Sequence, residues 1–278
     1  MNKRLAKVFA PVLAVILIFG GCSGVNPAEE RPTDTSSAQA QNSKKDGNEL
    51  KEITIPNIAT GELETFNFLH SQTAEDAQAL LNLWDGLLTS NSRGELVPAI
   101  AEEWGTEDGG LTWTFHIRDG VKWVDVNGKE MADCNANDFA TGMEWVLNFH
   151  KNESVNTSMP LEMIKGAKEY YEYTKTLSKE EAYALTGGEG SKFREMVGME
   201  IPDELTLIYH CIAEKPYFDT LATSNALYPL AQGLVDRLGV DGIASMNNTN
   251  MWYNGGYTMT SYIQGNEKVF TPNPKYWD

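Results

Sequence analysis

The segment that most constrains the fold is an alternating run at residues 111–118, which has an Asp-Gly pair on each side. Its period of two predicts a strand with one covered face. The apolar residues of that face are Leu111, Trp113, Phe115 and Ile117. The turn at Asp119 and Gly120 ends the strand, and residues 121–124 read as another short strand. The chain therefore needs a sheet that is covered on one side.

Helical patterns alternate irregularly with further strands along the chain. Helices are predicted over 74–88, 98–104, 137–148, 217–222, 229–238 and much of 151–195. Strands are predicted over 49–55, as a pair within 199–211, and as a hairpin of 256–263 with 268–271. Expected caps are Thr73 or Ser71, Asn135 or Asn137, and Ser178. This order indicates a mixed α/β or α+β fold.

The N-terminus has the pattern of an export signal. A basic start is followed by an apolar run at residues 8–20, shorter than the roughly 20 residues of a membrane-spanning helix. We predict a signal peptide over 1–21. The residues before Cys22 resemble a bacterial lipobox, so Cys22 is the expected lipidation site. Residues 22–48 are polar and read as a disordered tether that holds the protein at the outer face of a bacterial cytoplasmic membrane, or on the periplasmic side.

Composition and motifs exclude several functions. The formal net charge of −17 argues against a nucleic-acid partner, which requires a basic surface. The four histidines are isolated in sequence, and the chain has no Cys-x-x-Cys pair, phosphate-binding loop or Gly-x-Ser-x-Gly motif. We therefore expect no metal site, no cofactor and no catalytic residues. Cys134 and Cys211 either pair or stay free, and free thiols are favoured because two cysteines do not make a disulfide scaffold.

Several motifs together resemble one family, the extracellular solute-binding proteins of family 5, which include oligopeptide- and dipeptide-binding lipoproteins of ABC importers. The matching stretches are Leu-Trp-Asp-Gly-Leu-Leu at 83–88, the run from Gly94 to Trp104, residues 108–123, Asn-Ala-Asn-Asp-Phe at 135–139, residues 253–257 and Asn-Pro-Lys-Tyr-Trp-Asp at 273–278. Residues 151–195 match poorly. Residues 124–128 and Cys134 also depart from the family pattern.

The resemblance implies a receptor with two lobes that close on a ligand. It implies a lobe like those of type II periplasmic binding proteins, made of residues 49–84 and 196–278, with a small α+β domain inserted at 85–195. A second lobe follows the Tyr-Trp-Asp motif in such proteins, and this chain stops there. We therefore expect a truncated form without the second lobe.

The resemblance also implies that a peptide is held by its main chain between the lobes. In this lobe the contacts would come from Ser71, Gln72 and Thr73 and from Tyr253, Asn254 and Gly255. Ser71 is equally well explained as a helix cap, and Asn254 as a turn residue. Five tryptophans are expected in the core instead: Trp84, Trp104, Trp113, Trp123 and Trp145.

The implied function is capture of extracellular oligopeptides for import, with an ABC permease and ATPase as partners. The same scaffold is compatible with another solute: a pheromone peptide, a nickel chelate or an oligosaccharide. A surface lipoprotein without a transport role and an inactive fragment also remain open.

Overall fold

The computed structural model describes residues 52–55, 62–153 and 155–278. The chain divides into two compact units, Met1–Ile55 and Pro56–Asp278. In the first unit, residues 52–55 form neither strand nor helix, so the strand predicted over 49–55 is wrong there. The predicted signal peptide, Cys22 and the tether lie outside the described residues.

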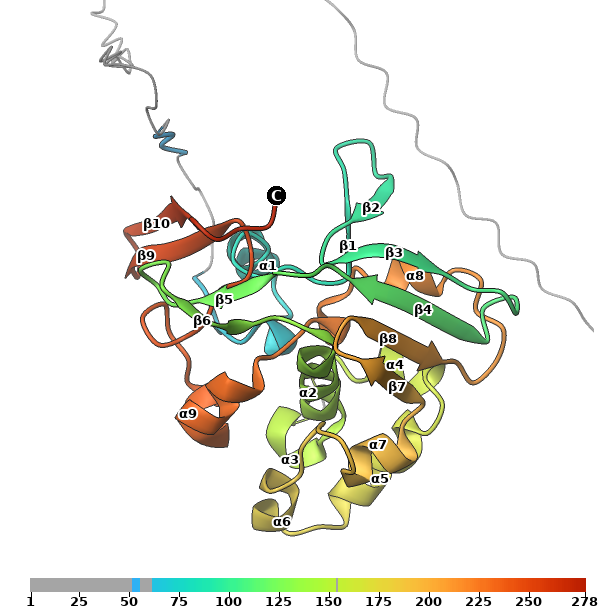
Figure 1. Ribbon diagram of the computed structural model, residues 1–278. Coiled ribbons are helices and arrows are strands. Elements are labelled where there is room, and N and C mark those ends of the chain that lie inside the picture. The colour runs from blue at the N-terminus through green and yellow to red at the C-terminus, as the bar shows by residue number, and fades with distance from the viewer. Residues whose placement is uncertain (1–51, 56–61, 154) are drawn as a thin grey trace, which may run out of the picture. The chain divides into compact units, whose positions relative to one another are not determined.

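The larger unit contains an antiparallel sheet of four strands in the order β3-β4-β8-β7 (Figure 1). The strands are β3 (Ala101–Gly105), β4 (Thr112–Ile117), β7 (Met199–Asp203) and β8 (Thr206–His210). In the two central strands Trp113 pairs with Tyr209, and Phe115 pairs with Leu207. These four side chains are buried, so the alternation confirms a strand within the predicted range 111–118 and the pair within 199–211. Leu111 is exposed and precedes β4, so its predicted place on the covered face is wrong.

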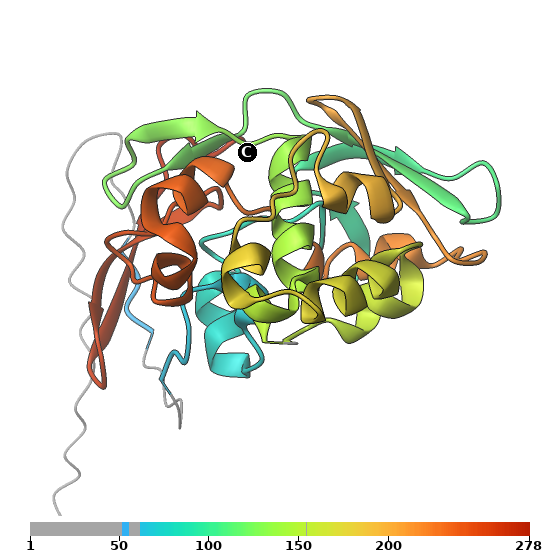
Figure 2. The same ribbon diagram turned by 90° about the horizontal axis from the view of Figure 1, so that it is seen from below.

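Helices α2 to α7 gather on one side of this sheet (Figures 1 and 2). Their bounds are α2 Ala136–Leu147, α3 Phe149–Asn152, α4 Ser158–Met163, α5 Ala167–Lys175, α6 Lys179–Tyr183 and α7 Lys192–Met196. The predicted caps are confirmed at both capping boxes, where Asn135 pairs with Asp138 and Ser178 with Glu181. The helices predicted over 137–148 and 151–195 are therefore present.

The remaining elements surround this core. The two-stranded sheets are β1 (Leu88–Ser90) with β2 (Leu96–Pro98), β5 (Lys122–Val124) with β6 (Glu130–Asp133), and β9 (Tyr257–Ile263) with β10 (Glu267–Pro272). The helical elements are η1 (Phe68–His70), α1 (Ala74–Leu80), α8 (Phe218–Leu221), η2 (Asn225–Leu227) and α9 (Gln232–Ala244). The last pair of strands confirms the predicted hairpin, and α8 and α9 correspond to the short helices predicted over 217–222 and 229–238.

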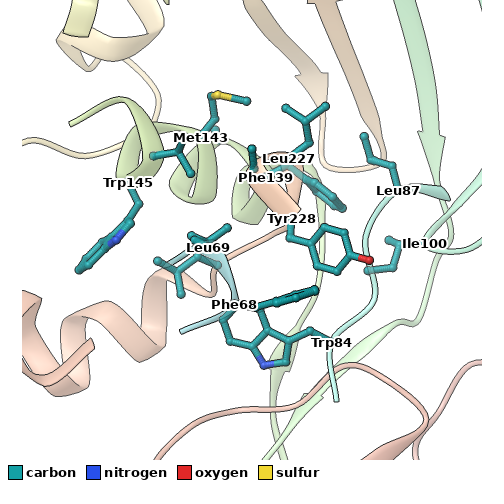
Figure 3. Close-up of a cluster of buried hydrophobic side chains, with 14 of the residues drawn as sticks. Phe68, Leu69, Trp84, Leu87, Ile100, Phe139, Met143, Trp145, Leu227 and Tyr228 are labelled. Carbon is teal, nitrogen blue, oxygen red and sulfur yellow. The ribbon is translucent and has the colours of Figure 1, made fainter. Parts of the chain in front are cut away.

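Helix α2 lies at the centre of a buried cluster (Figure 3). It contributes Phe139, Met143 and Trp145 to this cluster, which also contains Phe68 and Leu69 of η1, Leu227 of η2 and Tyr228. The rings of Phe68 and Tyr228 meet edge to face, with centroids 4.8 Å apart. A Cβ atom on Gly142 would lie 2.2 Å from the Tyr228 carbonyl oxygen, so the close approach of the two segments requires glycine.

The helix predicted over 98–104 is wrong. Residues 101–105 form β3, which pairs with β4 at Ala101↔Ile117 and Trp104↔Phe115. Alanine and glutamate favour helix, but a weak local preference yields to the gain from completing the sheet. Pairing buries Ala101 and leaves Glu102 and Glu103 exposed, with a register shift between Ala101 and Glu103.

The helix predicted over 74–88 is shorter than expected and ends at Leu80. Past this end, the carbonyls of Asn82 and Leu83 accept hydrogen bonds from the N–H groups of Tyr257 and Gly255, at 3.0 and 2.9 Å, and are therefore not available to continue the helix. Cys134 and Cys211 are free and buried, as favoured. The four-stranded sheet pairs strands from both sides of the boundary drawn at residue 195, and the division into lobe and insert stays a prediction.

Candidate functional site

Residues 71–73 form a short extended segment between η1 and α1. Ser71 has φ −63° and ψ 129°, and Thr73 has φ −107° and ψ 154°. Gln72 between them is exposed. Its main-chain N–H and C=O, and the N–H of Thr73, have no hydrogen-bond partner among the residues that the structure describes. An extended backbone with free donors and acceptors is the form that accepts an added strand.

The polar groups on either side of Gln72 are fixed by the fold. The Thr73 hydroxyl accepts a hydrogen bond from Asp76 N–H at 3.1 Å, so Thr73, not Ser71, caps α1. Ser71 ends η1 and donates its N–H to the Phe68 carbonyl at 3.1 Å. The Ser71 carbonyl accepts from the side-chain amides of Asn156 and Asn225, each at 3.0 Å. Gln72 is thus the exposed member of a segment that is held on both sides.

His70 anchors the same segment to α2. Its Nε2 accepts a hydrogen bond from the Trp145 indole Nε1 at 2.9 Å, so the ring proton is assigned to Nδ1. Burial lowers the pKa of His70 below its ordinary value, and the nearby negative charge of Glu153 opposes this. The neutral ring that accepts the indole N–H is therefore favoured.

Tyr253, Asn254 and Gly255 form a second, buried segment that packs on residues 83–85. Tyr253 exchanges two main-chain hydrogen bonds with Val124, at 2.8 and 2.9 Å. The Asn254 side chain accepts from Asp85 N–H at 2.9 Å and donates to the Asp85 carbonyl at 3.3 Å. These hydrogen bonds serve contacts within the chain. The structure therefore brings residues 253–255 to the end of α1, while residues 71–73 lie before its start.

Asp85 connects this segment to the last residues of the chain. Its Oδ2 accepts from the Trp277 indole Nε1 at 3.0 Å, and the Arg118 guanidinium lies 4.3 Å from the centre of the Trp277 ring. Burial raises the pKa of the Asp85 carboxyl, and hydrogen bonds from Trp277 and Tyr276 oppose the rise. Four of the sequence motifs thus meet in one cluster.

Asp138 is a second buried acid, at the start of α2. Its Oδ2 accepts from the Trp123 indole at 2.9 Å and from Asn135 N–H at 3.2 Å. Burial raises the pKa of Asp138 to about 6, although these hydrogen bonds act in the opposite direction. Burial also raises the pKa of the neighbouring Cys134 thiol well above its ordinary value, which keeps it protonated and unreactive.

A buried ion pair lies beside a pocket of about 370 Å³ between α2, α6 and α9. Lys151 Nζ lies 2.7 Å from Glu144 Oε2 and 2.6 Å from the Leu185 carbonyl oxygen. Glu144 Oε1 accepts from Asn148 at 2.8 Å and from the Tyr170 hydroxyl at 2.9 Å. Every oxygen of Glu144 has a partner, so the pair serves as a polar link between helices α2, α3 and α5.

The structure also bears on metal and membrane sites. Among residues 52–55, 62–153 and 155–278, no three His, Cys, Asp or Glu side chains converge to hold a metal ion. Within the same ranges, no helix has the length and apolar character needed to cross a membrane.

Comparison with known proteins identifies the family. Residues 95–278 match a sequence model described as bacterial extracellular solute-binding proteins, family 5 middle. The chain belongs to this family. Family 5 is a family of solute-binding proteins rather than of enzymes.

Family 5 relatives are similar over most of this chain. The oligopeptide-binding protein SarA of Streptococcus gordonii is 29% identical over 77% of this chain and 30% of its own length. The oligopeptide-binding protein AliA of Streptococcus pneumoniae is 29% identical over 82% and 32%. Haemophilus influenzae OppA, solved in complex with the peptide RPPGFSPFR, is 27% identical over 78% of this chain and 37% of that one, with a TM-score of 0.62. The chain thus spans about a third of the length of these relatives.

The resemblance pointed to Ser71, Gln72 and Thr73 as candidate site residues, but sequence reasoning missed the residues that hold this segment. Asn225 and Ser71 are 154 positions apart, and no spacing rule connects them. The one usable signal was Asn156 in a polar linker, because asparagine tolerates the left-handed backbone found there, with φ 56°. That signal predicts a turn and says nothing of a partner.

Proposed function

We propose that this chain takes part in capturing oligopeptides for an ABC importer, through the segment Ser71–Thr73, in which the main chain of Gln72 and the N–H of Thr73 would meet the ligand. The observation that carries the proposal is the exposed Gln72, which lies between the extended Ser71 and Thr73 and whose N–H and C=O have no hydrogen-bond partner within residues 52–55, 62–153 and 155–278. Peptides of different sequence share their main chain, so a broad receptor binds them by adding the ligand as a strand. The names of relatives SarA and AliA support a peptide as the solute.

The proposed site of action is outside the cytoplasmic membrane. The basic and apolar N-terminus supports export, and Cys22 supports a lipid anchor followed by a tether. A permease and an ATPase would be the partners. Metabolic labelling with palmitate should mark the full chain, and Cys22→Ala should abolish the label and release the protein from membranes. Equal labelling of the variant would contradict the anchor.

A titration followed by NMR tests peptide capture at Gln72. The full ¹⁵N-labelled chain is titrated with RPPGFSPFR, the peptide bound in the solved relative. We expect saturable shifts of the Gln72 and Thr73 amides. Because the chain spans about a third of its relatives, we expect weak binding. A version of the peptide with methylated main-chain nitrogens should bind at least about fivefold more weakly, since each lost hydrogen bond costs about 1 kcal/mol.

The same titration separates the alternatives. Shifts at residues 71–73 with maltotriose or a nickel–histidine chelate, but none with the peptide, would assign the scaffold to another solute. No response to any of the three would contradict capture by this chain. The role of Tyr253, Asn254 and Gly255 as ligand contacts stays a prediction, and shifts confined to residues 71–73 would argue against it.

A further inference from the structure

We propose that Asn156 and Asn225 are positioning residues that aim the main-chain N–H of Gln72 outward, toward the ligand. The inference rests on the proposed function, because it explains how the peptide-binding segment is held ready. It concerns two residues that do not themselves reach the ligand.

The two asparagines form a clamp on three carbonyl groups of one segment. Asn156 Nδ2 donates to the carbonyls of Leu69 at 2.8 Å and Ser71 at 3.0 Å. Asn225 Nδ2 donates to the carbonyls of Phe68 at 2.8 Å and Ser71 at 3.0 Å. A side-chain amide has two N–H donors, and both asparagines use the two. The Ser71 carbonyl therefore receives one donor from each side chain.

The orientation of the Ser71 carbonyl decides the direction of the next amide. A trans peptide unit is planar, so the Ser71 C=O and the Gln72 N–H point in opposite directions within one plane. Ser71 is 5% exposed, and its carbonyl is drawn inward by the two asparagines. The Gln72 N–H must then point away from the clamp. Rotation of this peptide plane would break two hydrogen bonds at once.

The residues before Ser71, whose carbonyls the two asparagines also bind, are held in place by the buried core. Phe68 and Leu69 are 4% and 0% exposed, and the neighbouring His70 ring is bonded to Trp145. Asn156 and Asn225 come from different parts of the chain, one after α3 and one at the start of η2. The segment is therefore pre-organised before a ligand arrives, which reduces the entropy lost on binding.

Variants that keep the shape but lose the donors test the clamp. Asn156→Asp retains a residue that tolerates the left-handed backbone, and Asn225→Asp is its counterpart. Neither carboxylate has N–H groups to donate. The matched control is Asn248→Asp, because Asn248 Nδ2 donates to the Met259 carbonyl at 3.1 Å, in a different part of the fold. Asn225→Ala serves as an uncharged second variant.

The first measurement is ¹⁵N relaxation of the Gln72 amide in the full chain without ligand. We expect a rigid order parameter of about 0.85 in the wild type and in Asn248→Asp, and a value below about 0.6 in the double variant. If the double variant does not fold, the single variants should show intermediate values. An unchanged Gln72 order parameter in folded variants would overturn the proposal and leave the asparagines a purely structural role.

The second measurement is affinity for RPPGFSPFR. We expect each single variant to bind about threefold to tenfold more weakly, while Asn248→Asp binds like the wild type. Loss of affinity that is equal in Asn248→Asp and the clamp variants would contradict a positioning role. If the wild type binds no peptide, the proposed function fails. The relaxation result then still decides whether the clamp orders Gln72.

Discussion

The indole Nε1 of Trp277 donates a hydrogen bond to Asp85 Oδ2 at 3.0 Å, across 192 positions of sequence. Arg118 covers the face of the same indole, with its Cζ 4.3 Å from the ring centre. Asp85 is in turn bonded through its main chain to the Asn254 side chain. One cluster of contacts therefore joins four of the sequence motifs, which lie at 83–88, 108–123, 253–257 and 273–278.

Trp277→Phe should lower the free energy of unfolding by about 2 kcal/mol. The change leaves a largely buried Asp85 oxygen without its donor, which costs about 1–3 kcal/mol, and weakens the contact with Arg118. Urea denaturation measures the effect. The control is Trp104→Phe, because within the described ranges the half-buried Trp104 indole N–H has no hydrogen-bond partner. Equal losses in the two variants would show that the hydrogen bond to Asp85 contributes nothing.

Gly255→Ala should destabilise the protein more than any change confined to the surface. A Cβ atom there would lie 2.7 Å from the Leu83 carbonyl carbon and 2.8 Å from Trp84 N. Both are backbone atoms, so the clash cannot be relieved by rotating a flexible side chain. We expect a loss of about 1–3 kcal/mol or more. Gly105→Ala is the matched control, since no atom lies within 4 Å of its Cβ position. Thermal unfolding compares the two, and a Gly255→Ala protein as stable as Gly105→Ala would refute the close packing.

Local patterns predicted those elements whose ends are set by nearby residues. The capping box of Asn135 and Asp138 and the alternation of β4 are local, and both are confirmed. Contacts distant in sequence decided the rest. Residues 101–105 form a strand because they pair with β4. The residues after α1, which ends at Leu80, form main-chain hydrogen bonds with the segment that contains Gly255. For the candidate site, the resemblance pointed to Ser71, Gln72 and Thr73, but the hydrogen bonds from Asn156 and Asn225 depend on how the folded segments meet.

Lys151→Met should cost about 3–5 kcal/mol of unfolding free energy, because it leaves the Glu144 carboxylate buried without a counter-charge. The side chains of Lys151 and Glu144 are only 4% and 2% exposed. The control Lys192→Met removes a surface pair with Glu195 at 3.1 Å and should cost less than about 1 kcal/mol. Adding Glu144→Gln to Lys151→Met should recover part of the loss, since it removes the stranded charge. Similar losses for Lys151→Met and Lys192→Met in urea denaturation would argue against an energetically important buried pair.

The free energy of unfolding should decrease as the pH rises from about 4 to about 6, because the buried Asp138 carboxyl loses its proton in this window. Burial raises the pKa of Asp138 from its ordinary 3.8 to about 6, so the folded chain holds this proton more tightly than the unfolded chain. The contribution is full below pH 3.8 and is lost as the pH rises through about 6, and it amounts to at most about 3 kcal/mol. Asp138→Asn should therefore flatten the pH dependence of the unfolding free energy in this window, whatever it does to absolute stability. Glu180→Gln, which removes an exposed carboxylate on α6, should leave the slope unchanged. An Asp138→Asn protein whose stability falls as steeply as that of the wild type between pH 4 and 6 would show that Asp138 does not bind its proton in this way.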